Sequence, residues 1–192
     1  MAEFVSHGLP VSREEFPKSC WQRKCGGCGL IRDLLPVWVM VAKQVIKAAS
    51  GWLELGMPDD ALEELNGLTG NDRHSRDALE LKLAVQMAKE SWKDAAETAV
   101  ELCGLVADEP DFFLSAAYCL HETGETEEAR KVLLRGPGVL EEFPVFHYNM
   151  ACYLWTLGEK DDAKSHLDKA VGMDESFLDS ARNDRDLVGM EI

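Results

Sequence analysis

The chain has 192 residues, of which 46% are hydrophobic and 29% charged, the proportions of an ordinary folded domain. Its net charge is −15, and residues 40–192 alone hold 15 basic and 31 acidic side chains, a net charge of −16. So acidic a surface repels phosphate backbones, which argues against nucleic-acid binding. The one membrane-like run, residues 34–42, has nine residues, far below the roughly 20 that a membrane-spanning helix needs.

Residues 1–39 differ from the rest of the chain in net charge and in residue composition. They contain three cysteines at C-x4-C-x2-C spacing, Cys20, Cys25 and Cys28. This spacing matches the first three ligands of a plant-type iron–sulfur site, but the next cysteine is Cys103, far along the chain. A zinc site would lack the usual two pairs of ligands, and a labile redox pair at Cys25 and Cys28 is a further alternative. We favour a poorly structured leader without metal, or a translation start at Met40.

The other three cysteines do not suggest a disulfide framework. Cys103, Cys119 and Cys152 fall in apolar patterns typical of helices, and nothing resembling a signal peptide precedes them. Free thiols are typical of a reducing compartment. We therefore expect a cytoplasmic protein.

Four similar segments organise the remainder of the chain. They begin at Trp52, Gln86, Leu120 and Leu154, each 34 residues after the one before. Alanine recurs in the same register in all four, at Ala61, Ala95, Ala129 and Ala163. Glycine recurs in three of them, at Gly56, Gly124 and Gly158, and Glu90 takes its place in the second. Chance would not keep small residues in step over this length, so we interpret the pattern as an internal repeat.

Each repeat has the pattern of two helices joined by a tight turn. In the fourth, apolar residues recur at helical spacing on both sides of Gly158, which lies where a helix end favours positive φ. In the third, Gly136, Pro137 and Gly138 interrupt the second helix, because proline removes a hydrogen-bond donor and clashes with the preceding turn. We expect a break there, with residues 139–143 resuming as a short helical turn.

The period, the helix–turn–helix content and the small residues resemble the tetratricopeptide repeat, in its small stand-alone bacterial form. The resemblance implies an all-α, right-handed α-α superhelix over residues 40–175. Its four units are expected at residues 42–75, 76–109, 110–143 and 144–175. Residues 176–192 would then form a C-terminal cap, in which Ser176 and Asp179 resemble a capping box that opens a short helix.

In such arrays the first helix of each pair lines a concave groove, so the resemblance also implies a binding surface. In the third and fourth repeats the groove would collect Leu114, Tyr118, His121, Tyr148, Asn149, Cys152 and Trp155. Aromatic side chains with one polar group are typical of interface hot spots. The alternative interpretation is that these residues contact the C-terminal cap helix or simply fill the core.

No catalytic arrangement is visible: the chain has no phosphate-binding glycine loop, no nucleophile elbow and no metal-ligand pairing of histidines. We therefore expect a non-enzymatic interaction scaffold without cofactors, which binds a peptide or helix of a partner protein with basic or apolar character. One alternative is a small cytoplasmic chaperone resembling those that hold type III secretion translocators. The other is a metal or redox protein built on the cysteine cluster of residues 1–39.

Overall fold

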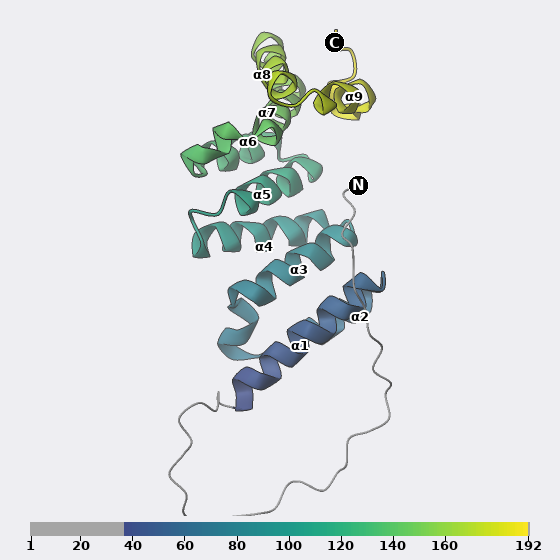
Figure 1. Cartoon of the computed structure of the whole chain (residues 1–192), viewed down its shortest axis with the longest axis vertical. Coiled ribbons are helices and arrows are strands. Elements are labelled where there is room, and N and C mark those ends of the chain that lie inside the picture. Colours follow the sequence, from purple (N-terminus) through teal and green to yellow (C-terminus); the bar gives the residue numbers. More distant parts are fainter. Residues whose placement is uncertain (1–36, 192) are drawn as a thin grey trace, which may run out of the picture. The chain divides into compact units, whose positions relative to one another are not determined.

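The computed structural model describes residues 37–191, so Cys20, Cys25 and Cys28 and almost all of the predicted leader fall outside the described residues. Within this part of the chain all regular structure is helical, which confirms the all-α prediction. The α-helices are α1 (Val37–Glu54), α2 (Pro58–Asn66), α3 (Arg76–Ala88), α4 (Trp92–Leu105), α5 (Pro110–Glu122), α6 (Thr126–Arg135), α7 (Pro144–Leu157), α8 (Lys160–Met173) and α9 (Ser176–Asn183). Short 3₁₀ helices are η1 (Gly70–His74), η2 (Gly138–Glu142) and η3 (Arg185–Leu187). Each α-helix packs against the next α-helix along the chain (Figure 1).

The starts of the helices keep the period of the sequence. The second helices of the pairs begin at Pro58, Trp92, Thr126 and Lys160, each 34 residues after the last. The first helices α3, α5 and α7 begin at residues 76, 110 and 144, with the same spacing. Helix α1 departs from it, because it begins at Val37, five residues ahead of position 42. Met40 therefore lies inside α1, and a chain that began there would lack the first three residues of this helix.

The recurring alanines are the closest-packed residues of the core. Ala61, Ala95, Ala129 and Ala163 are all 0% exposed, as are Ala49, Ala117 and Ala151 in the first helices. A methyl side chain lets two helix backbones approach closely, so each pair forms a tight hairpin. The first helices of neighbouring repeats also touch, since α1 packs on α3 and α5 packs on α7.

The turn between paired helices has one backbone geometry in all four repeats. Its central residue has positive φ, between 72° and 88° at Gly56, Gly124 and Gly158. In the second repeat Glu90 takes the same geometry with a φ of 54°, and no other residue except glycine has positive φ among residues 37–191. Because a Cβ disfavours this conformation, Glu90 stores backbone strain.

The third repeat is interrupted where the sequence predicts it. Helix α6 ends at Arg135 after 10 residues, four fewer than α4 or α8, and η2 follows from Gly138. A Cβ on Gly136 would collide with the side chain of Leu140 and press on the ring of Phe113. Glycine at this position therefore lets Leu140, 1% exposed, enter the core after the break.

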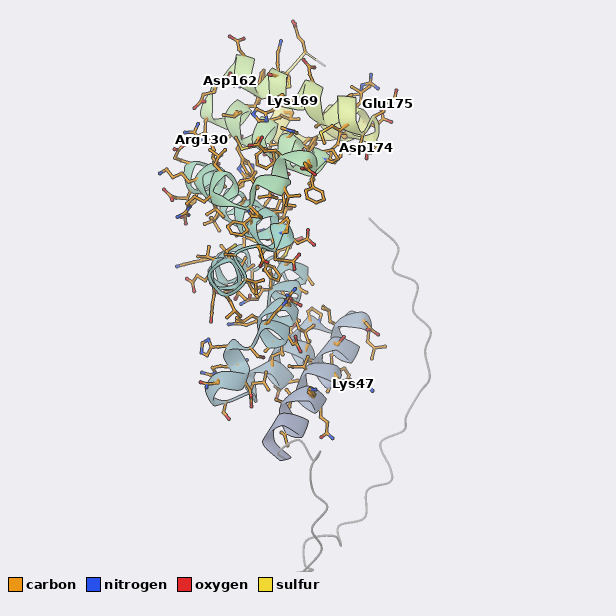
Figure 2. The ribbon with its side chains drawn as sticks, turned by 60° about the vertical axis from the view of Figure 1, so that its left-hand side comes forward. Lys47, Arg130, Asp162, Lys169, Asp174 and Glu175 are labelled. Atoms are coloured by element: carbon orange, nitrogen blue, oxygen red, sulfur yellow. The ribbon has the colours of Figure 1, made fainter. Side chains whose placement is uncertain are left out.

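The C-terminal cap begins with the short helix that was predicted, but its predicted capping box is wrong. Ser176 is the first residue of α9 and makes no side-chain cap. The carboxylate of Asp174 takes that role, since its Oδ1 accepts a hydrogen bond from the Ser176 backbone N–H at 2.9 Å. Figure 2 shows Asp174 and Glu175 at the connection between α8 and α9. An acidic residue two positions before the helix thus replaces the serine as its cap.

Candidate functional site

The predicted groove residues lie on two neighbouring first helices. Leu114, Tyr118 and His121 belong to α5, and Tyr148, Asn149, Cys152 and Trp155 belong to α7. Four of the seven (His121, Tyr148, Cys152 and Trp155) contact one stretch of backbone and side chains, residues 184–190, which we call the C-terminal segment. Leu114 and Asn149 are half-buried, and Tyr118 lies beside the segment. Four of the seven residues therefore contact the C-terminal cap, as the alternative interpretation expects.

The carboxylate of Asp184 receives two donors from α7. The Tyr148 hydroxyl donates to Asp184 Oδ2 at 2.6 Å, and the Cys152 thiol donates to the same oxygen at 3.8 Å. Burial, together with the hydrogen bond to Asp184, raises the pKa of Tyr148. Burial and the nearby Asp184 charge likewise raise the pKa of Cys152. Both groups therefore stay protonated, and they face the carboxylate as neutral donors.

A second carboxylate, that of Asp186, meets His121 of α5. Its Oδ2 lies 3.1 Å from His121 Nε2, while His121 Nδ1 lies 2.9 Å from the hydroxyl of Thr126. The imidazole is nearly enclosed, with a side-chain exposure of 8%, and it stacks on Tyr153 with ring centroids 4.8 Å apart. Because a carboxylate only accepts hydrogen bonds, Nε2 carries the proton and serves as a third donor.

Two more polar contacts hold the segment. The indole N–H of Trp155 donates to the carbonyl oxygen of Val188 at 3.2 Å. Arg185, between the two aspartates, donates through Nη2 to Glu122 of α5 at 2.5 Å. Glu122 has a side-chain exposure of only 11%, whereas Arg185 is 71% exposed, so this ion pair sits at the rim of the groove.

Apolar side chains of the same region fill the space beneath these contacts. Leu187 is 2% exposed and Met190 9%, and both join the main apolar cluster, which extends from α3 to α9. Just before the segment, the ring of Phe177 lies against Tyr148 with a centroid distance of 5.0 Å. The C-terminal segment is therefore held both by an apolar anchor and by hydrogen bonds at its side chains.

Tyr118 marks the part of the surface that the segment leaves open. Its ring meets Trp92 of α4 edge-on at 5.5 Å, and Tyr118 is 38% exposed. A cavity of about 360 Å³ adjoins the segment here. Its lining is formed by Glu90, Trp92, Tyr118, Glu122, Asp184, Arg185 and Asp186.

Sequence reasoning found the groove residues that contact the C-terminal segment but missed the residues that complete this arrangement. Glu122 lies just outside the assumed groove positions, and Trp92 opens a second helix. Asp184 and Asp186 fall after the last helical stripe, where no periodicity indicates a facing partner. The one local signal was the alternation of two acids around Arg185 directly before a leucine.

The comparisons with known proteins bear on these repeats directly. Residues 145–177, which span α7, α8 and the start of α9, match the family model described as tetratricopeptide repeat. This stretch of the chain is therefore a tetratricopeptide repeat. No curated protein matches it. Among solved structures, the chain named "MamA MSR-1 C2" is similar with a TM-score of 0.63 and 14% sequence identity, over 73% of this chain and 86% of that one. At this identity the likeness shows the fold, an all-α helical repeat superhelix.

Tetratricopeptide-repeat proteins are in general scaffolds for protein interaction, and this chain shares their helical-repeat fold. Within residues 37–191 no three side chains of the histidine, cysteine or carboxylate types are grouped so as to hold a metal ion. Cys103, Cys119 and Cys152 are free thiols, and burial raises the pKa of Cys103 and of Cys119 to about 11. The described part of the chain also contains no helix long and apolar enough to cross a membrane.

Proposed function

We propose that this tetratricopeptide-repeat protein is a non-enzymatic scaffold that binds a segment of a partner protein in the groove of its first helices, at α5 and α7. The residues concerned are those predicted for the groove: Leu114, Tyr118, His121, Tyr148, Asn149, Cys152 and Trp155. The array of residues 40–175 serves as the rigid body that presents them. We place the protein in the cytoplasm, in keeping with its free thiols.

The observation that supports the proposal is the C-terminal segment itself. It lies across α5 and α7 through side-chain contacts from Tyr148, His121 and Trp155 rather than through generic apolar packing alone. A surface that holds one short segment with matched hydrogen bonds has the chemistry to hold another. The aromatic rings supply large contact area with few rotatable bonds, which lowers the entropic cost of binding.

The partner is a protein and not a nucleic acid, because residues 40–192 carry a net charge of −16. That charge also speeds the approach of any partner whose flanking regions are basic, since long-range attraction raises association rates. Close-range contacts in the groove then decide which segment stays bound.

Capture from a native lysate on the full chain, followed by hydrogen exchange of the purified complex, tests the proposal. We expect new protection of the backbone in α5 and α7. Tyr118→Ala should weaken capture, because Tyr118 is exposed beside the segment and holds none of its hydrogen bonds in the described structure. Leu134→Ala is the matched control, since this exposed apolar side chain lies on the second helix α6. Protection confined to α4, α6 and α8 would show that another face binds the partner.

A further inference from the structure

The groove residues of α5 and α7 present hydrogen-bond donors. We infer that the partner segment this groove takes is acidic, with two carboxylates one residue apart followed directly by a leucine, and that residues 184–187 of the chain itself compete with it. The inference rests on the proposed function and specifies its ligand. It also replaces the expectation of a basic or apolar segment at this position.

The polar groups that line the groove decide the charge of the ligand. Tyr148, Cys152 and His121 each direct a hydrogen at a carboxylate oxygen, at 2.6, 3.8 and 3.1 Å. A lysine or arginine placed at either aspartate position would bring donors against donors in a half-buried site. A carboxylate there gains charge-assisted hydrogen bonds instead. The acidic surface of the domain thus attracts basic segments, whereas the donor-lined groove favours an acidic one.

The residue between the two carboxylates is recognised by charge as well. Arg185 pairs with Glu122 at the rim, and Glu122 is largely enclosed by its own helix and neighbours. Since Arg185 itself is mostly exposed, the pair adds selectivity rather than a large share of the affinity. We therefore expect a basic or neutral residue at the middle position and discrimination against an acidic one.

The leucine supplies the apolar anchor. Leu187 follows Asp186 directly and is 2% exposed within the main apolar cluster. At the next residue, Val188, the backbone carbonyl oxygen accepts a hydrogen bond from the indole N–H of Trp155. A backbone carbonyl is present in every peptide, so this contact fixes the register without restricting the sequence. The pattern read by the groove is acid, any non-acidic residue, acid, leucine.

Covalent attachment makes the chain's own segment a strong competitor. It reaches the groove through α9, so its effective concentration is on the order of millimolar or above. A free peptide of similar intrinsic affinity binds the wild-type chain poorly for this reason. Replacing the carboxylates of Asp184 and Asp186 should weaken the hold on the chain's own segment and open the site to a competing acidic segment.

Fluorescence anisotropy on the full chain tests this inference. The probe is a labelled peptide with the sequence of residues 183–191, and a control peptide has asparagine in place of both aspartates. The protein variant is Asp184→Asn with Asp186→Asn, which keeps the shape of the segment and leaves Leu187 in place. Asp179→Asn is the control variant, because Asp179 is exposed on α9 and pairs with Arg182 of the same helix, away from the groove contacts.

We expect the double variant to bind the acidic probe at least tenfold more tightly than either the wild type or Asp179→Asn does. The asparagine peptide should bind none of them. Adding Tyr148→Phe to the double variant should lose about tenfold in affinity, because it removes one donor and keeps the ring. Circular dichroism and thermal melts establish that each variant is folded.

Three results would overturn the inference: equal binding of the two peptides, equal affinity of the double variant and the wild type, or no effect of Tyr148→Phe. A wild-type chain that forms concentration-dependent dimers through exchange of its C-terminal segments would overturn it too, since the occupant would then be a second copy. If the captured partner protects α5 and α7 but is not displaced by the acidic probe, the groove proposal stands and only this ligand class is wrong. Without protection of α5 and α7 by any captured partner, the proposed function itself fails.

Discussion

The phenolic hydroxyl of Tyr148 on α7 lies 2.6 Å from the carboxylate of Asp184, although the two residues are 36 positions apart in the chain. Tyr148 is half-buried, and its ring also packs against Phe177 of α9. Together with the contacts of Cys152 and Trp155, this pair ties the last repeat to the segment that follows α9. Stability and groove occupancy are therefore coupled through these hydrogen bonds.

Tyr148→Phe should destabilise the fold by about 1.5–3 kcal/mol, the usual range for a hydrogen bond to a charged group. The substitution keeps the aromatic contact with Phe177 and removes only the donor to the carboxylate. Urea unfolding followed by circular dichroism measures the change. Hydrogen exchange should speed up in residues 184–190 first. A loss of stability spread evenly over the array would contradict the local role given to this bond.

Tyr153→Phe is the matched control variant, and we do not expect it to lower the free energy of unfolding as Tyr148→Phe does. Tyr153 is 1% exposed, and its hydroxyl has no hydrogen-bond partner among residues 37–191. Tyr153→Phe removes a buried polar group without opening a cavity of any size. The free energy of unfolding should stay constant or rise by about 1 kcal/mol. A loss comparable to that of Tyr148→Phe would mean that the Tyr153 hydroxyl is bonded in solution.

The positions of most helices could be predicted because one physical requirement recurs at one period. Two paired helices need a small residue where their backbones cross, and alanine meets it at Ala61, Ala95, Ala129 and Ala163. Glycine or a strained residue then closes each turn. Where the requirement is absent, prediction failed: α1 begins earlier than the register, and α9 is capped by Asp174 instead of Ser176.

The candidate site was predictable on one side only. The resemblance to the tetratricopeptide repeat placed His121, Tyr148 and Trp155 on the groove face, and all three contact the C-terminal segment. Their partners, Asp184 and Asp186, lie in a short 3₁₀ turn and the residue before it. No repeating pattern governs such a turn, so its position depends on contacts between residues more than 30 positions apart.

Ala151→Leu should cost about 1–3 kcal/mol, because a larger side chain at a fully buried helix crossing forces the backbones apart. Ala151 is 0% exposed between α7 and its neighbours. Ala84→Leu, on the exposed face of α3, should change stability by no more than about 0.5 kcal/mol. Thermal melts of the two variants against the wild type give the comparison. Equal effects would place the helix crossing elsewhere.

Glu90→Gly should stabilise the chain by about 0.5–1 kcal/mol. Relief of the positive φ at this turn outweighs the extra freedom that glycine gives the unfolded chain. The other three turns already have glycine at this place, and Glu90 has a φ of 54°. Glu90→Ala is the control, since it removes the carboxylate but keeps the strained backbone, and it should gain little. If alanine stabilised as much as glycine, charge repulsion and not strain would be the cause.

The histidine pair of α7 and α8 makes stability depend on pH. His147 Nδ1 lies 3.0 Å from His166 Nδ1, and His147 Nε2 donates to the carbonyl of Glu141 at 3.1 Å. Burial lowers the pKa of His166 below its ordinary value, and His147 and Lys169 lower it further against the opposing charges of Asp162 and Glu141.

Since the folded chain holds a proton on His166 less readily than the unfolded chain does, protonation favours unfolding. This contribution to stability is fully present above about pH 6.5, the ordinary pKa of a histidine side chain. It is lost as the pH falls from there toward the lower pKa of His166 in the folded chain. Urea midpoints should therefore drop between pH 7.5 and pH 5.5. His166→Gln should flatten this drop, because the titrating ring is gone while a hydrogen bond to His147 Nδ1 can still form. A pH dependence as steep in His166→Gln as in the wild type would assign the effect to other groups.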